Sequence, residues 1–295
     1  MTLTTPLLIP LACAFLYVLA ALTFKRAAAL GIGVWRTNFV ANWTIFAVFA
    51  PGWLLTSAPV PAWSLWWQPA AAGLAFLAGQ SFIFLAISRG DVSITTPVMG
   101  SKVVFVALLT SLLRVGEVPW KWWIGAALSA AAVGLLHVGE RHGPRRAVGA
   151  SVGFALASAL CYGLGDVLMQ KWASAWGPGR FFPAMFLCVA VTSFAFVPLF
   201  SAPLRALDGR GWRLVGLGGL LMAVNNAGIV LTIGFWGGAT AVNIVYSVRG
   251  LVSVVLVWAI GHWFANEERQ LAPAVLRLRF VGAALMLAAV ALVLI

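Results

Sequence analysis

Residues 124–138, IGAALSAAAVGLLHV, match residues 281–295, VGAALMLAAVALVLI, and about half of the aligned positions are identical. The two segments lie about half a chain apart. Each half of the chain is therefore predicted to be one copy of the same structural unit. Because alanine-rich apolar segments also match by chance, the repeat needs a second pair of matching segments.

The beginning of each half supplies that second match. Residues 12–31 align with residues 157–177 when one residue is inserted before Gly177. Two matches in the same order are hard to attribute to composition alone, so they favour an internal duplication. The aligned pairs include Tyr17 with Tyr162, Leu19 with Leu164, and Arg26 with Lys171.

The composition places the chain in a membrane. Hydrophobic residues make up 62% of it, charged residues only 9%, and the mean hydropathy is +1.00. A soluble domain with a charged surface does not have such values. Uncharged runs of about twenty residues, the length that spans a bilayer, recur along the sequence. The composition predicts an all-α integral membrane protein in contact with lipid.

We interpret the apolar runs as ten transmembrane helices, five in each half. An odd number of helices per copy makes the second copy enter the membrane from the opposite side, which gives an inverted repeat. We expect residues 1–138 to form the first copy, 139–147 a linker, and 148–295 the second copy, together making one domain. The expected helices are 3–24, 34–56, 70–88, 91–114, 120–138, 148–172, 180–200, 213–236, 239–265 and 276–295.

Positive charge is distributed unevenly between alternate loops. The loops after helices 1, 3, 5, 7 and 9 hold thirteen Lys and Arg residues, whereas the other loops hold four. Because cytoplasmic loops are enriched in Lys and Arg, this count predicts that both termini lie outside the cytoplasm. The basic residues form no single patch or arm, so the net charge of +12 does not indicate nucleic-acid binding.

Two basic residues remain, Lys102 and Arg249, near the middles of the fourth and ninth expected helices. An ionised side chain at the bilayer centre costs a few kcal/mol, so such residues face a polar partner or cavity and are candidates for function. Within segments 86–104 and 232–250, setting Gly90 on Gly237 places Lys102 close to Arg249. The repeat is expected to bring both cations to one central cavity.

The acid Asp166 cannot neutralise both cations, so an anionic ligand group such as a carboxylate would complete the pairing. The alternative is that Asp166, backbone carbonyls and water satisfy both cations structurally. Other polar or break-forming residues lie on the same expected helices. The predicted substrate-binding set is Lys102, Arg249, Tyr17, Gln80, Met99, Tyr162, Asp166, Asn225, Asn226, Asn243 and Tyr246, and the predicted helix breaks or gating hinges are Pro97, Gly90, Gly237 and Gly238.

Enzymatic chemistry finds little support in the sequence. The three histidines are scattered, and no metalloprotease, nucleophile-elbow or nucleotide-binding motif is present. The three cysteines do not have the spacing of metal ligands. We therefore expect no catalytic residues, no metal site and no cofactor.

The ordered set of features resembles the drug/metabolite transporter superfamily, in its EamA-type branch. The features are the inverted repeat, Gly116-Glu117 after the fourth helix, Asn266-Glu267 after the ninth, and small-residue fifth and tenth helices. The resemblance covers essentially the whole chain and is most similar to the amino-acid exporters. One difference concerns the orientation in the membrane. Many members have basic residues after the second and tenth helices, which imply cytoplasmic termini, whereas residues 57–69, which follow the second expected helix here, contain none.

This resemblance implies a secondary exporter of small amphipathic metabolites, above all amino acids, that works by alternating access in a bacterial inner membrane. A monomer is the expected state. Two alternatives stay open. The first is an exporter of drugs or other metabolites, including organic anions, and the second is a channel or scaffold without alternating access. A proton-linked mechanism would need a titratable buried acid, for which Asp166 is the candidate.

Overall fold

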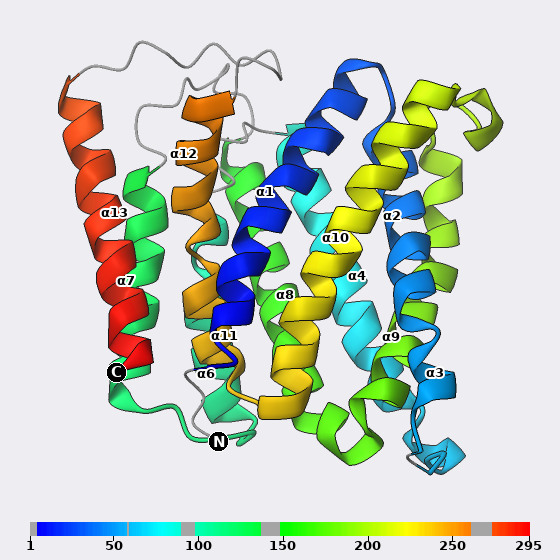
Figure 1. The fold of residues 1–295 in the computed structure, drawn as a ribbon, viewed down its shortest axis with the longest axis horizontal. Helices are drawn as coiled ribbons and strands as arrows, with labels where there is room; N and C mark the ends of the chain where they lie inside the picture. The colour runs from blue at the N-terminus through cyan, green and yellow to red at the C-terminus, as the bar shows by residue number, and fades with distance from the viewer. Residues whose placement is uncertain (1–4, 58, 90–97, 137–147, 261–272) are drawn as a thin grey trace.

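The computed structural model describes residues 5–57, 59–89, 98–136, 148–260 and 273–295, and all regular structure among them is helical (Figure 1). The predicted hinges Gly90 and Pro97 and the predicted linker 139–147 lie outside the described residues. The fold class expected from composition is thus confirmed as all-α.

Seven helices in the described part of the chain are long and apolar enough to cross a membrane. Two further apolar helices, Lys102–Leu112 and Trp120–Leu136, are shorter. The protein is therefore an α-helical, membrane-embedded protein. The seven spans are Leu8–Ala29, Val34–Leu55, Trp63–Ala86, Gly149–Trp176, Pro178–Leu199, Gly209–Trp236 and Arg277–Leu294.

The helical elements follow one another in chain order. Up to residue 136 they are α1 (Leu8–Ala29), α2 (Val34–Phe49), α3 (Gly52–Leu55), the 3-10 helix η1 (Trp63–Leu65), α4 (Trp67–Arg89), α6 (Lys102–Leu112) and α7 (Trp120–Leu136). From residue 148 they are α8 (Val148–Trp176), α9 (Pro178–Thr192), η2 (Ser193–Leu199), η3 (Leu204–Ala206), α10 (Gly209–Trp236), α11 (Ala239–Tyr246), α12 (Arg249–Ile260) and α13 (Pro273–Leu294).

Several observed helix ends differ from the expected ones. The first helix runs to Ala29 instead of residue 24, because three alanines favour its continuation up to Gly31, whose φ of +75° ends it. Residues 239–265 were expected to form one helix, but a turn at Ser247 and Val248 separates α11 from α12. A turn at Gly100 and Ser101 likewise precedes α6.

Three helix pairs make the most extensive contacts: α4 with α8, α1 with α10, and α7 with α13. Small residues let these backbones approach closely, as is typical of helix packing in membranes. A Cβ added to Gly79 of α4 would lie 2.8 Å from the Tyr162 ring of α8. A Cβ on Gly282 of α13 would lie 3.0 Å from the Ala132 carbonyl oxygen of α7. The glycines therefore set the spacing within the bundle.

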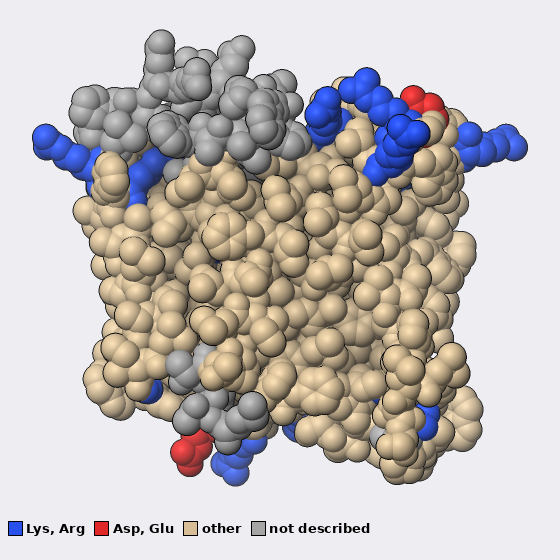
Figure 2. All heavy atoms as spheres, in the orientation of Figure 1, with Lys and Arg blue, Asp and Glu red and all other residues tan. Residues whose placement is uncertain are grey.

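The two ends of the bundle differ in charge. Helix α1 begins and α13 ends at the same end (Figure 1). On the face shown in Figure 2, basic side chains gather mainly at the opposite end, where α1 ends and α10 and α13 begin. The middle of this face is almost free of charged side chains (Figure 2), as a surface in contact with hydrocarbon requires.

Candidate functional site

Both intramembrane cations begin a helix in the interior of the bundle. Lys102 is the first residue of α6 and Arg249 the first residue of α12, and each follows a two-residue turn. In the second turn the Val248 amide donates to the Val245 carbonyl at 3.2 Å and the Gly250 amide to the Ser247 carbonyl at 2.9 Å. Neither helix has an acidic residue in its first turn. Each cation therefore adds to the positive end of a helix dipole, which makes the region attractive to an anion.

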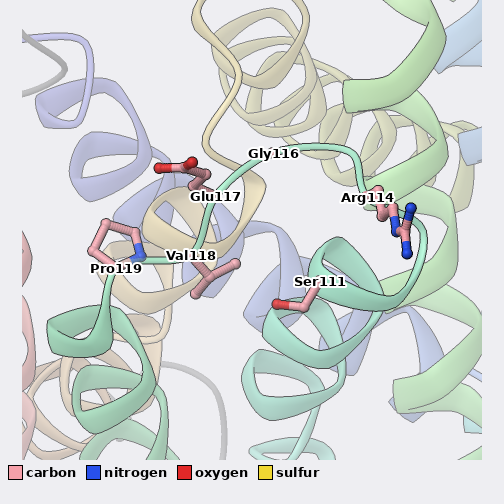
Figure 3. Close-up of a pocket in the computed structure, with 6 residues that line it drawn as sticks. All are labelled: Ser111, Arg114, Gly116, Glu117, Val118 and Pro119. Atoms are coloured by element: carbon pink, nitrogen blue, oxygen red, sulfur yellow. The ribbon is translucent and has the colours of Figure 1, made fainter.

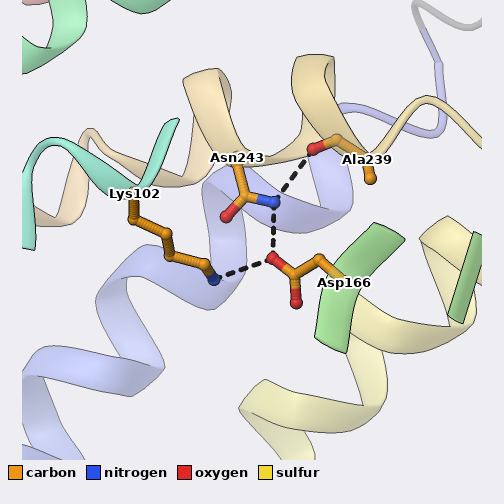
Figure 4. Close-up of polar contacts among 4 residues, drawn as sticks. All are labelled: Lys102, Asp166, Ala239 and Asn243. Carbon is orange, nitrogen blue, oxygen red and sulfur yellow. Dashed lines mark hydrogen bonds and ion pairs between the residues drawn. The ribbon is translucent and has the colours of Figure 1, made fainter. Parts of the chain in front are cut away.

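Lys102 is already paired with an acid. Its Nζ lies 2.8 Å from Oδ2 of Asp166 on α8, and the two side chains are 12% and 6% exposed (Figure 4). The Asn243 amide of α11 donates to the same oxygen at 2.7 Å and to the Ala239 carbonyl at 2.9 Å. Two donors on one oxygen stabilise the charged carboxylate. This half of the site is neutral overall.

Arg249 has different neighbours. Its guanidinium carbon lies 4.7 Å from the centroid of the Tyr17 ring and 4.6 Å from that of Tyr246, and the two rings meet edge to face at 6.1 Å. Aromatic faces attract a cation but do not cancel its charge. The single ion pair among the described residues joins Lys102 and Asp166, so Arg249 has no acidic partner among them. Lys102 lies close enough to Arg249 for the two charges to interact.

All three tyrosines of the chain belong to this cluster. Tyr162 of α8 lies beside Lys102, with Nζ 5.6 Å from the ring centroid, as Tyr17 of α1 lies beside Arg249. Each cation therefore contacts a tyrosine from the other half of the chain. The sequence prediction that Lys102, Arg249, Asp166, Asn243 and the tyrosines converge agrees with this geometry.

The neighbouring asparagines point to different targets. The Asn225 side-chain amide lies 3.0 Å from the Tyr246 hydroxyl. With the amide oxygen and nitrogen exchanged, the Asn225 nitrogen also donates to the Cys13 carbonyl at 2.9 Å. Asn226 donates instead to the Met222 carbonyl of its own helix at 2.9 Å. Adjacent helical positions differ by about 100°, which accounts for the divergence. Asn225 thus positions Tyr246, whereas Asn226 bonds within α10.

Gln80 makes its side-chain hydrogen bonds outside the polar cluster. The Gln80 side chain exchanges two hydrogen bonds with Asn42 of α2, at 3.0 and 3.1 Å, and both side chains are buried. This pair satisfies both amides and ties α2 to α4. Met99 lies half-buried in the short helical stretch before α6. Asn42 was not among the predicted residues, although its amide side chain, like that of Gln80, stands out in an apolar span.

The predicted hinge at Gly237 and Gly238 forms the turn between α10 and α11. The φ angles are +72° and +67°, which favour glycine at both positions. Gln170 near the end of α8 accepts a hydrogen bond from the Ala239 amide at 2.7 Å and so holds the start of α11. Gln170 was not among the predicted residues because it lies beside a helix end, where a polar side chain has no special meaning.

A surface hollow lies away from this cluster, in the connection between α6 and α7 (Figure 3). The side chains of Glu117 and Arg114 lie apart in Figure 3. Among the described residues, no group of three or more His, Cys, Asp or Glu side chains is placed to hold a metal ion. The lining residues are Ser111, Arg114, Gly116, Glu117, Val118 and Pro119.

Comparisons with known proteins support the fold and carry no information about the chemistry of the site. No protein-family model matches the chain, and no curated protein matches it. Solved structures that match include a crystal structure described only as that of a protein, with a TM-score of 0.76 and 17% sequence identity over 99% of this chain and 98% of that one. The chain shares its fold with that structure over nearly its whole length.

Proposed function

We propose that the protein is a secondary transporter that exports small amphipathic metabolites bearing a carboxylate, with amino acids as the class that the family resemblance implies. The observation that carries this proposal is Arg249, a cation inside an apolar helical bundle with no acidic partner among the described residues. Intramembrane cations are costly and mark ligand pathways. A guanidinium also matches a carboxylate through two parallel hydrogen bonds.

We also propose that the fold is the ten-helix inverted repeat of EamA-type transporters. In the proposed repeat, α1 corresponds to α8 and α4 corresponds to α10. Mapping each half on the other therefore turns the contact between α4 and α8 into the contact between α10 and α1, and both contacts are extensive. The pair α7 and α13 maps on itself. Gly282 of α13 faces Ala132 of α7, and Gly125 of α7 faces Ala289 of α13. In the alignment of 124–138 with 281–295, Gly125 corresponds to Gly282 and Ala132 to Ala289. Such reciprocal contacts are those of a two-fold axis, and Ser129 and Met286, which are also equivalent, contact each other at 4.0 Å.

Alternating access would use the two interrupted helices. The turns at 100–101 and 247–248 correspond when Lys102 is set on Arg249. Discontinuous helices near the membrane centre are where secondary transporters bind substrates. All eight residues of α11 are buried, and α11 ends at Tyr246 beside Arg249. Opening the site requires α11 to move, with the turn at Gly237 and Gly238 as its hinge.

For the membrane orientation, we propose that both termini lie outside the cytoplasm of a bacterial inner-membrane protein. The support is the concentration of basic side chains at the end opposite the termini (Figure 2). A C-terminal reporter that fluoresces only inside cells should stay dark. A fluorescent reporter would contradict this orientation.

The experiment that tests transport is counterflow in proteoliposomes loaded with unlabelled amino acids and organic acids, with and without a proton gradient. We expect saturable uptake of at least one labelled carboxylate, with acceleration by internal substrate. Arg249→Met should abolish it, whereas Arg210→Met, at an exposed position, should not. Non-saturable flux without counterflow would favour a channel. Uptake that is unchanged in Arg249→Met would favour the second candidate, a drug exporter with a largely apolar pocket.

A further inference from the structure

The charges of the cluster do not sum to zero. Lys102 and Asp166 form a neutral pair, and Asn243 adds a hydrogen bond but no charge. Arg249 contributes one further positive charge, flanked by the uncharged rings of Tyr17 and Tyr246. The described core of the site therefore carries a net charge of +1. The other two described acids, Glu117 and Asp208, lie in connections at the ends of helices.

The ligand's own charge decides whether this excess is neutralised. A zwitterionic amino acid contributes no net charge, so the site remains at +1 whichever of its groups contacts Asp166 or Arg249. A ligand with one carboxylate and no ammonium brings the sum to zero. A dianion brings it to −1. Because the bundle interior is shielded from water, an uncompensated charge there is far costlier than at a surface.

The starts of α6 and α12 add to this preference. Both helices begin at the cations and have no acid in the first turn, so their positive dipole ends add to the charge of Lys102 and Arg249. An ammonium group in this field is repelled except beside Asp166. That carboxylate oxygen already accepts from Lys102 and Asn243. The site has little to offer the ammonium group of an amino acid.

We infer that the site selects its substrate by net charge and prefers monoanionic organic acids over zwitterionic amino acids of the same skeleton. This inference rests on the proposed transport function and narrows its substrate class. It also gives each charged residue a separate role. Arg249 binds the carboxylate, and the Lys102–Asp166 pair, which is neutral in sum, leaves the charge of Arg249 as the one that the ligand must match.

The test is calorimetric titration of the purified full-length protein with four ligands that share a branched side chain. They are leucinamide (+1), leucine (0), 2-hydroxy-4-methylpentanoate (−1) and isobutylmalonate (−2). We expect the monoanion to bind at least about tenfold more tightly than leucine, since only the monoanion removes the buried charge. Equal or tighter binding of leucine would overturn the inference. If none of the four binds and the proteoliposome panel shows no saturable uptake, the proposed function fails as well, so the two failures are distinguishable.

Charge variants should move the preference in opposite directions. Arg249→Gln lowers the site to zero and should favour leucine over the monoanion, whereas Asp166→Asn raises it to +2 and should favour the dianion. Arg249→Lys keeps the charge and should keep the preference for the monoanion. Arg210→Gln, an exposed change of equal size, is the control. Each variant is first checked for a monodisperse peak and a cooperative thermal transition. An unchanged order of affinities in folded Arg249→Gln would also overturn the inference.

Discussion

The two cation sites of the bundle are built alike but compensated differently. Lys102 and Arg249 each begin a helix after a two-residue turn, and each lies beside a tyrosine from the other half of the chain. Lys102 also has Asp166 at 2.8 Å. In the alignment that sets Tyr17 on Tyr162, Ala21 corresponds to Asp166, so the Arg249 side has no such acid. The comparison shows that two similarly placed cations differ in net charge when only one of them has an acidic partner among the described residues.

The largest expected effect comes from breaking the compensated side. Asp166→Asn leaves Lys102 as an unpaired cation in the bundle interior, and we expect it to lower the free energy of unfolding by about 3–5 kcal/mol. Reversible unfolding in mixed micelles, followed by tryptophan fluorescence, measures this. The double variant Lys102→Met with Asp166→Asn should recover much of the loss. A loss below about 1 kcal/mol in Asp166→Asn would show that the pair is not essential to the fold.

The Arg249 side should respond in the opposite way. Arg249→Gln removes a charge that has no acidic partner among the described residues, but it also removes two cation–π contacts, so we expect the free energy of unfolding to fall by no more than about 1 kcal/mol. Carboxylate binding should weaken by about 1.5–3 kcal/mol, the value of hydrogen bonds to charged groups. Unfolding and calorimetric titration of the same preparation separate the two quantities. A large loss of stability with unchanged binding would make Arg249 a structural residue.

A smaller effect is expected from moving the tyrosine beside Lys102. Gly79→Ala places a Cβ 2.8 Å from the Tyr162 ring, so α4 and α8 must separate or the ring must shift. Overpacking of this kind costs about 1–3 kcal/mol. Gly216→Ala on α10 is the matched control, because a Cβ there meets nothing within 4 Å. Thermal unfolding of both variants in detergent gives the comparison. Equal stability would show that this contact is loosely packed.

The smallest effect concerns the ring beside Arg249. Tyr246→Phe keeps the aromatic face but removes the hydroxyl that lies 3.0 Å from the Asn225 amide. We expect a loss of about 0.5–1.5 kcal/mol in the free energy of unfolding. Carboxylate affinity should fall less than in Arg249→Gln. Tyr246→Leu, which also removes the cation–π contact, should cost more than Tyr246→Phe. Equal losses in the two variants would assign the contribution to the hydroxyl alone.

Sequence reasoning reached much of the fold because the membrane restricts the choices. Apolar run length predicts helices, and the exclusion of unpaired charge from hydrocarbon singles out Lys102 and Arg249. The breaks at 100–101 and 247–248 were not predicted at these positions, although Pro97 was predicted to break the first of the two helices. The sequence around Ser247 and Val248 contains neither proline nor glycine at the break itself. Their position depends on packing between helices distant in the chain.

The pairings of the candidate site were less accessible than its members. The sequence identified Asp166 as the one interior acid but left open which cation it neutralises. That choice depends on α6, α8 and α11 meeting around Asp166, a tertiary arrangement that residue spacing does not determine. Gln80 shows the converse case. Its place in an apolar span suggested binding, whereas Asn42 pairs with both the oxygen and the nitrogen of its side-chain amide.

One measurement tests the central claim most directly: binding of 2-hydroxy-4-methylpentanoate to two variants compared side by side. The first, Lys102→Met with Asp166→Asn, removes the ion pair and leaves the net charge at +1, whereas the second, Arg249→Gln, removes the uncompensated cation. If Arg249 holds the ligand, the double variant retains affinity within about tenfold of the original protein, and Arg249→Gln loses more than that. The reverse result, with binding lost in the folded double variant and retained in Arg249→Gln, would contradict the assignment of Arg249 as the anchor.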